Sequence, residues 1–282
     1  RVASELDELA LQLGPGTIAA FVAETVVGAT LGAVPAVSGY FRAIREICDR
    51  HGILLILDEV MCGLGRTGSL FAFEQEGILP DILCIAKGLG AGYQPIAAMV
   101  VSQKVHDTIR DGTGAFLHGH TYQAHPVACA AAKVAIDKIA RPELIAHVAD
   151  RGEQLIEGLR QRLAGHRFVG DIRGRGLFVG IEFVADRETK APFAAAAGVN
   201  RMVKQAAMER GLLCYPMGGT VDGRTGDHVL LAPPFIISAG EIDDVVGTFS
   251  DAVEEALERA SSKSGNTARA AVAGARRVVN PA

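Results

Sequence analysis

Two apolar runs in this sequence end on charged residues that could do chemistry. The run ILLILDEV closes on Asp58 and Glu59, and the run DILCIA leads directly into Lys87. The carboxyl ends of strands in an open α/β sheet are where ligands bind, and a charge held there needs a partner. Lys87 is therefore either an ordinary solvent-exposed strand end or an amine held for attack on a carbonyl carbon.

Nucleotide binding is the first chemistry to weigh against these residues. Gly88, Gly90 and Gly92 are spaced as GxGxG rather than GxGxxG, and Pro95 follows where a Rossmann helix would begin. Asp58 and its apolar run fit a Walker B box, whose partner would be Mg²⁺ on a nucleotide, but the chain contains no GxxxxGK[ST] loop. A P-loop ATPase is therefore the weakest of the alternatives.

A protonated heterocycle nitrogen is the other partner that Asp58 could have. Asp58 would then hold the positive charge that makes pyridoxal phosphate an electron sink. This interpretation also accounts for Lys87, because an aldehyde cofactor needs an amine for its Schiff base.

Composition limits the class of protein. The chain has 282 residues, 49% of them hydrophobic and 21% charged, with a formal net charge of −4, which is globular composition for one large or two ordinary domains. Its five cysteines are scattered without CxxC spacing, which predicts reduced thiols in a cytoplasm. We find no signal-peptide pattern and no apolar run as long as a membrane span, and the basic residues are not clustered. Neither a membrane nor nucleic acid is expected as a partner.

The first 160 residues predict strands alternating with helices, and so an α/β fold with a mostly parallel sheet. We expect a helix from a Ser38 cap to about Arg50, ended by Gly52, with four apolar residues inward: Phe41, Ile44, Ile47 and Cys48. The expected strands are 17–27, 53–60, 81–86 and 96–101, and the expected helices are a buried one from Pro126 and another from Pro142 to about Leu163.

The sequence pattern changes after residue 160. Strands are expected at 171–184, 211–216 and 228–235, and a helix at 241–259 with four inward residues: Ile242, Val245, Val246 and Phe249. We therefore divide the chain into a partial cofactor-binding large domain at 1–160, a smaller α+β domain at 161–260, and a disordered tail at 261–282.

Three separated motifs resemble class III aminotransferases, which are fold type I pyridoxal-phosphate enzymes. They lie in HGILLILDEVMCGLGRTGSLFAFEQEGILPDILCIAKGLGAGYQPIAAMVVS and HGHTYQAHPVACAAA, and the resemblance covers roughly residues 22–257. It implies that Asp58 pairs with the pyridine nitrogen, that Val60 packs on the ring, and that Lys87 forms the Schiff base and then moves protons. It also implies a homodimer in which Thr121 binds the cofactor phosphate of the neighbouring subunit.

The sequence departs from the family pattern in several places. Met61 stands where the family often has Gln, Thr25 follows Glu24 where the family has Pro, and QAHP stands for SGHP. The family also has an earlier segment, with a Gly-rich phosphate turn and a ring stacked on the cofactor, that precedes the part matched here. We expect the 282 residues, which begin at Arg1, to be a fragment lacking this N-terminal part and to bind cofactor weakly without it.

Other polar residues have less specific interpretations. Glu24 is interpreted as a pocket residue that contacts cofactor, and Arg224 as one that could bind a substrate carboxylate. Arg66 is interpreted as a loop-stabilising ion pair in preference to a substrate clamp.

The segment around Thr121 also contains an HxH pattern. His118 and His120 are interpreted as part of a phosphate loop, without a metal, since no third ligand is evident. Tyr122 and Tyr215 are interpreted as packing residues.

The sequence thus predicts a transaminase that moves an amino group between an amine or ω-amino acid and a 2-oxo acid through a Lys87 Schiff base. A decarboxylase or aminomutase with the same cofactor is one alternative. A non-catalytic or complementation-dependent fragment is the other.

Overall fold

The computed structural model describes residues 1–277 of the chain. The helices are α1 (Ser4–Leu13), α2 (Tyr40–His51), α3 (Gln103–Asp111), α4 (Pro126–Ile139), α5 (Pro142–Leu163), α6 (Val199–Glu209) and α7 (Ala239–Arg277). The strands are β1 (Ala20–Glu24), β2 (Val26–Val27), β3 (Val34–Pro35), β4 (Leu54–Asp58), β5 (Ile82–Ile85), β6 (Ala98–Val101), β7 (Val169–Arg175), β8 (Phe178–Phe183), β9 (Tyr215–Gly218) and β10 (Asp227–Leu231). Short 3₁₀ turns are η1 (Ala72–Glu76), η2 (Lys87–Leu89) and η3 (Ala195–Ala197).

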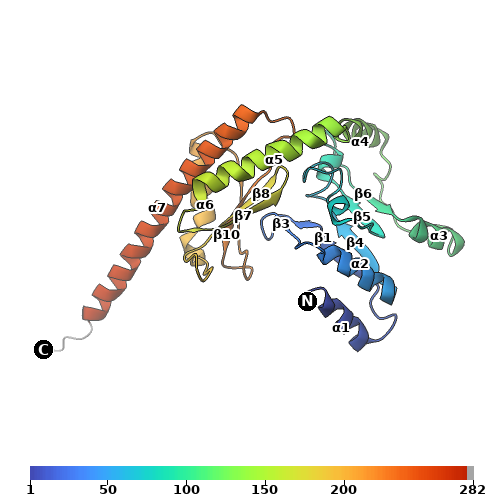
Figure 1. Cartoon of the computed structure of the whole chain (residues 1–282), viewed down its shortest axis with the longest axis horizontal. Coiled ribbons are helices and arrows are strands. Elements are labelled where there is room, and N and C mark those ends of the chain that lie inside the picture. The colour runs from blue at the N-terminus through green and yellow to red at the C-terminus, as the bar shows by residue number, and fades with distance from the viewer. Residues whose placement is uncertain (278–282) are drawn as a thin grey trace.

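The N-terminal sheet has the strand order β1-β4-β5-β6. β1, β4 and β5 are parallel, and β6 runs antiparallel to β5 at one edge. Helix α2 packs its apolar face on this sheet, and its four buried residues are the predicted ones, Phe41, Ile44, Ile47 and Cys48. The predicted α/β architecture with a mostly parallel sheet is confirmed (Figure 1).

The C-terminal sheet is antiparallel throughout, with the order β7-β8-β10-β9. Helices α5, α6 and α7 pack against it and against one another, and together they enclose the largest hydrophobic core of the molecule. Figure 1 shows α5 extending from this sheet to α4 beside the N-terminal sheet, so that α5 connects the two halves.

Several predicted element boundaries are wrong. Helix α2 begins after Gly39, which is left-handed, and Ser38 does not cap it. The segment 17–27 is two strands, β1 and β2, and 171–184 is the β7–β8 hairpin, because glycines at 174 and 176 take positive φ at its turn. Helix α4 buries one stripe, made of three alanines and Ile139, while its other face, with Val134, is exposed.

The domain division stays a prediction, but the observed elements bear on its boundaries. The two four-stranded sheets fall on either side of residue 160, while α5 runs through that position. Helix α7 continues to Arg277, into the segment 261–282 that we expected to be disordered, where TARAAVAGARR is rich in the helix formers Ala and Arg. Residues 278–282 lie outside the described part of the chain.

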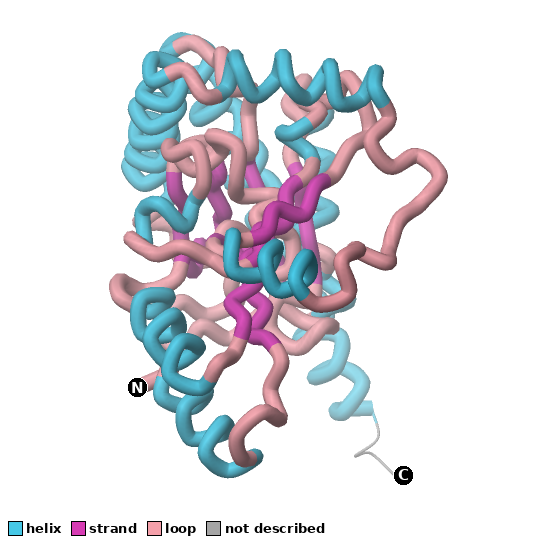
Figure 2. The backbone as a smooth tube through the Cα atoms, turned by 90° about the vertical axis from the view of Figure 1, so that its right-hand side faces the viewer, coloured by secondary structure: helices cyan, strands magenta, loops and turns pink. Residues whose placement is uncertain are grey.

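The connection between α3 and α4 is an extended loop. Figure 2 shows it projecting from the body of the molecule, and residues 112–125 are exposed throughout. Among the described residues, none of the helices combines the length and the hydropathy that crossing a membrane would require.

Candidate active site

Three of the predicted site residues lie at the carboxyl ends of neighbouring strands. Glu24, the last residue of β1, is in register with Asp58, the last residue of β4. Asp58 is in turn in register with Cys84 on β5, three residues before Lys87. Parallel pairing of these strands therefore brings Glu24, Asp58 and Lys87 to the same end of the sheet.

Asp58 is half-buried, and its carboxylate is held by its own backbone turn. Its Oδ1 accepts a hydrogen bond of 2.9 Å from the Val60 N–H. Within the described residues this is the only hydrogen bond to the carboxylate, so Oδ2 is free to accept from a ligand. Burial, and after it the negative charge of Asp58, raises the pKa of the neighbouring Cys84 thiol.

Glu59 is the adjacent carboxylate, and it is a structural group. Its side chain is 1% exposed. Oε1 accepts from the Thr25 hydroxyl at 2.9 Å and from the Phe73 N–H at 2.7 Å, and Oε2 accepts from the Ala72 N–H at 2.7 Å. Burial raises the pKa of Glu59, and these three donors oppose that rise. Since both oxygens are occupied by Thr25 and by the backbone of η1, Glu59 has a structural role.

Lys87 is exposed and sits in a strained backbone conformation. Its φ is 42°, in the left-handed region that costs a non-glycine residue about 1–3 kcal/mol. The turn after it is tight: its carbonyl accepts from the N–H groups of Gly90 and Ala91 at 3.1 Å. A Cβ added to Gly90 would lie 2.1 Å from the main-chain carbonyl oxygen of Gln94, so glycine is required there. The glycine run therefore serves a turn that presents Lys87.

Glu24 is half-buried and contacts a loop that the sequence analysis did not single out. Its Oε2 accepts a 2.7 Å hydrogen bond from the Gly28 N–H. A Cβ added to Gly28 would lie 2.7 Å from Met61 Sδ, so Met61 packs directly on this turn. The signal for the loop was present as glycines at 28 and 32 after a strand, which is typical of a close backbone approach.

Thr121 lies in the exposed loop before α4, and no described contact joins it to Asp58 or Lys87. His118 and His120 lie in the same loop with ring centroids 5.9 Å apart. The described residues contain no cluster of three or more potential metal-ligating side chains. Tyr122 in this loop and Tyr215 at the start of β9 are 82% and 51% exposed, so neither packs in the core of the described residues as we expected.

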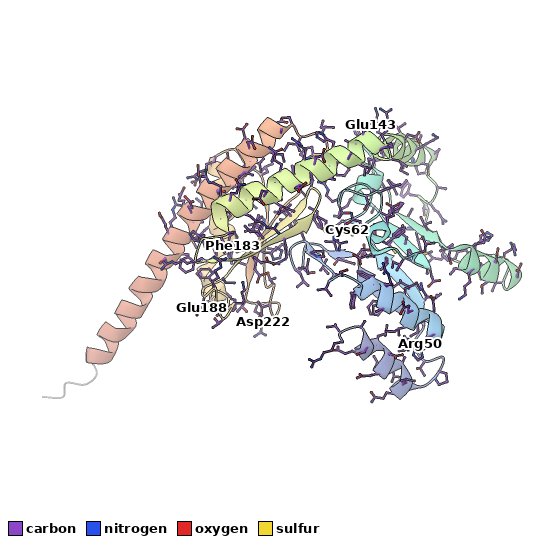
Figure 3. All side chains as sticks on the ribbon, in the orientation of Figure 1. Arg50, Cys62, Glu143, Phe183, Glu188 and Asp222 are labelled. Atoms are coloured by element: carbon purple, nitrogen blue, oxygen red, sulfur yellow. The ribbon has the colours of Figure 1, made fainter. Side chains whose placement is uncertain are left out.

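The two arginines are placed differently. Arg224 is exposed in the β9–β10 turn, where its N–H donates to Asp222 Oδ1 at 2.8 Å. Figure 3 shows Asp222 near the outer end of this turn.

Arg66 Nη1 donates to the carbonyls of Leu177 and Pro233 at 3.1 and 2.7 Å, and burial lowers its pKa to about 10. Arg66 therefore stabilises its loop through carbonyls, and the expected ion pair is wrong because the described residues place no carboxylate on it.

Cys62 marks the contact between the two halves of the molecule (Figure 3). It shares a buried cluster with Val26 from the N-terminal half and with Phe178 and Leu230 from the C-terminal sheet. Burial, as the largest cause, raises the pKa of its thiol to about 12, so it is an inert apolar group.

A family model described as aminotransferase class-III matches residues 1–253. An aminotransferase of Gibberella zeae is 49% identical over 91% of this chain and 50% of that protein. The chain spans about half the length of the curated relatives it matches.

Solved structures agree with this likeness. A Bacillus anthracis aminotransferase superposes with a TM-score of 0.84 at 38% identity, over 90% of this chain and 56% of that one. An amine transaminase from an uncultivated Pseudomonas species, solved in its PLP-bound form, superposes with a TM-score of 0.81 at 37% identity, over 92% and 56%. The fold type I transferase architecture predicted from the sequence is confirmed.

Proposed function

This chain belongs to the class III aminotransferase family, and on that premise we propose that it forms the lysine-bearing side of a transaminase site. The proposed reaction moves an amino group between an amine or ω-amino acid and a 2-oxo acid. Class III aminotransferases depend on pyridoxal phosphate, which when bound supplies an electron sink for the carbanion formed during the transfer.

The residues at the sheet edge fit that cofactor. An aldehyde needs an amine, and Lys87 presents one at the end of β5. A protonated ring nitrogen needs a carboxylate, and Asp58 has a free oxygen at the end of the neighbouring strand. The register that pairs Glu24 with Asp58, and that brings Lys87 to the same end of the sheet, is the observation that carries the proposal.

Each residue then has a defined role. Lys87 Nζ would bond the cofactor aldehyde and afterwards carry a proton to and from the substrate carbon. Asp58 would keep the ring nitrogen protonated, and the half-buried Val60 side chain would pack on the ring. Glu24 would line the pocket.

Thr121 supports the proposal of a homodimer. Its hydroxyl is exposed in a loop that projects from the body of the molecule, where it could reach a phosphate bound by a neighbouring subunit. One charge-assisted hydrogen bond contributes about 1.5–3 kcal/mol. This is too little to hold a freely exchanging cofactor tightly, so we expect weak cofactor binding by the 282-residue chain by itself.

The amine side of the substrate pair is supported by the amine transaminase among the similar structures. Arg224 is proposed to bind the substrate carboxylate from the β9–β10 turn.

A decarboxylase or aminomutase on the same site is the second candidate within this cofactor class. Dependence on a complementing chain is the remaining alternative. The compartment proposed is the cytoplasm.

The test is a cofactor titration followed by visible absorbance. The 282-residue chain is compared with an extended chain, in which it is joined to the part of the Gibberella zeae aminotransferase that it does not match. The extended chain is expected to give a visible band and to transaminate a primary amine with a 2-oxo acid. Lys87→Ala is expected to lose both, whereas Lys104→Ala, an exposed lysine on α3, should keep both. A visible band that survives Lys87→Ala would overturn the proposal.

A further inference from the structure

The hairpin loop between β2 and β3, residues 28–33, connects the candidate site to the C-terminal sheet. On the site side, its Gly28 N–H donates to Glu24 Oε2 at 2.7 Å. A Cβ on Gly28 would lie 2.7 Å from Met61 Sδ and 3.1 Å from Glu24 Oε2. The position of this bridging loop therefore sets the position of the Glu24 carboxylate.

On its other side, the bridging loop is held by Arg173 of β7. The Arg173 guanidinium donates from Nε to the Gly32 carbonyl at 2.9 Å and from Nη2 to the Leu31 carbonyl. Its Nη1 pairs with Glu182 Oε2 at 2.5 Å and with Asp171 Oδ2 at 3.1 Å, and the Arg173 side chain is only 13% exposed. These two carboxylates thus fix the direction in which the guanidinium meets the loop.

His228 of β10 holds the same loop at a third carbonyl. Its ring is fully buried, with Nε2 at 3.0 Å from the Ala29 carbonyl and Nδ1 at 2.6 Å from the Thr220 hydroxyl. A carbonyl can only accept, so we assign the ring proton to Nε2, and Nδ1 accepts from Thr220. Burial lowers the pKa of His228, which favours this neutral form.

The bridging loop packs directly on the C-terminal sheet, without room for an added side chain. A Cβ on Gly180 of β8 would lie 2.0 Å from the Gly32 oxygen. A Cβ on Gly32, whose φ is 81°, would lie 2.6 Å from the His228 ring. Since backbone packs directly on backbone here, a displacement of the C-terminal sheet is passed to the bridging loop.

We infer that Arg173 and His228 are positioning residues, which fix the bridging loop and through it place Glu24 at the candidate site. The claim that Arg173 and His228 fix the bridging loop needs only the contacts above. Its meaning for the reaction rests on the proposed function, in which Glu24 lines the pocket.

The test is hydrogen–deuterium exchange on the cofactor-free 282-residue chain. His228→Leu keeps most of the ring volume and removes the donor to Ala29, whereas His228→Gln keeps an N–H that can reach it. The matched control is His147→Leu, because His147 Nε2 makes the same kind of bond, 2.8 Å to the Ile237 carbonyl, away from the loop.

We expect His228→Leu to speed exchange of peptides covering residues 24–33 about tenfold, by the scale of one lost buried hydrogen bond. Peptides from β4 and α5 should keep the wild-type rate, His228→Gln should restore most of the protection, and His147→Leu should leave the loop unchanged. Unchanged exchange of the loop in His228→Leu, or an equal rise in every peptide, would overturn the inference.

A second pair of variants keeps the test decisive if His228→Leu does not fold. Arg173→Met removes the donors to Leu31 and Gly32, and its control, Arg162→Met, removes an exposed ion pair with Asp251. Faster exchange of the loop in the first variant alone supports the inference, and equal exchange in both contradicts it. Because no cofactor is present, this result is independent of the titration that tests the proposed function.

Discussion

The two four-stranded sheets of the described residues are covered very differently. All five residues of β10 in the C-terminal sheet are buried, with helices and neighbouring strands around them. In the N-terminal sheet, three of the four residues of the edge strand β6 are exposed, and Met99 and Val100 are about half exposed. The candidate site lies on this open sheet.

The C-terminal sheet contributes most to the packed core, and the N-terminal sheet carries the candidate site. The C-terminal sheet contains a continuous core and holds the bridging loop, whereas the N-terminal sheet carries the exposed Lys87 and the half-buried Asp58 at the carboxyl ends of its strands. An apolar pattern such as that of β6 shows that a strand suits burial, but it does not show what covers it. Within the described residues, β6 has no strand on its outer edge.

Core truncation should give the largest contrast between the sheets. Phe249→Ala removes a fully buried ring from the C-terminal core and should lower the free energy of unfolding by about 3–5 kcal/mol. Met99→Ala on β6 should cost less than about 1 kcal/mol, because its side chain is already half in water. Urea unfolding of both variants checks this, and equal losses would show that the sheets are equally packed.

The acid-to-amide change at Asp58 should affect turnover and spare the fold. In the extended chain, Asp58→Asn should lower the transamination rate about 10² to 10³-fold, because an amide cannot keep the ring nitrogen protonated. Its unfolding free energy should stay within about 0.5 kcal/mol of wild type. Steady-state kinetics with a primary amine gives the answer, and near-normal turnover would refute the role of Asp58.

The acid-to-amide change at Glu59 should lower stability and spare the cofactor site. Glu59→Gln replaces one acceptor oxygen by an NH₂ that faces a backbone donor, so the variant should lose about 1–3 kcal/mol of stability. We expect unfolding to report this loss while the visible cofactor band of the extended chain keeps its position. A Glu59→Gln protein as stable as wild type would show that Ala72 and Phe73 find other partners.

The smallest effect concerns the backbone of Lys87. Lys87→Ala keeps a Cβ at a φ of 42°, whereas Lys87→Gly removes it. The glycine variant should therefore be about 1 kcal/mol more stable than the alanine variant, by the cost of a non-glycine residue in the left-handed region. Thermal unfolding of the pair measures this, and an alanine variant of equal or greater stability would mean that the position is relaxed.

Much of this arrangement follows from the sequence. The apolar face of α2 and the runs that become β4 and β5 predicted the N-terminal sheet. The charged residues that end those runs are the candidate site residues, and their roles stay a prediction. The predicted element boundaries were wrong where a glycine with positive φ ends or begins an element, as at Gly39 before α2 and at the β7–β8 turn. The contacts of Arg173 and His228 with the bridging loop could not be predicted, because they join residues more than 140 positions apart through main-chain carbonyls that leave no sequence pattern.

Borohydride reduction tests the central claim most directly, since it asks which amine bonds the cofactor aldehyde. The extended chain is incubated with pyridoxal phosphate, reduced, digested, and its peptides are mapped for the reduced cofactor. The account predicts the label on Lys87 and its loss in Lys87→Ala. A stable label on another lysine, such as Lys104 or Lys190, with Lys87 unmodified, would contradict it.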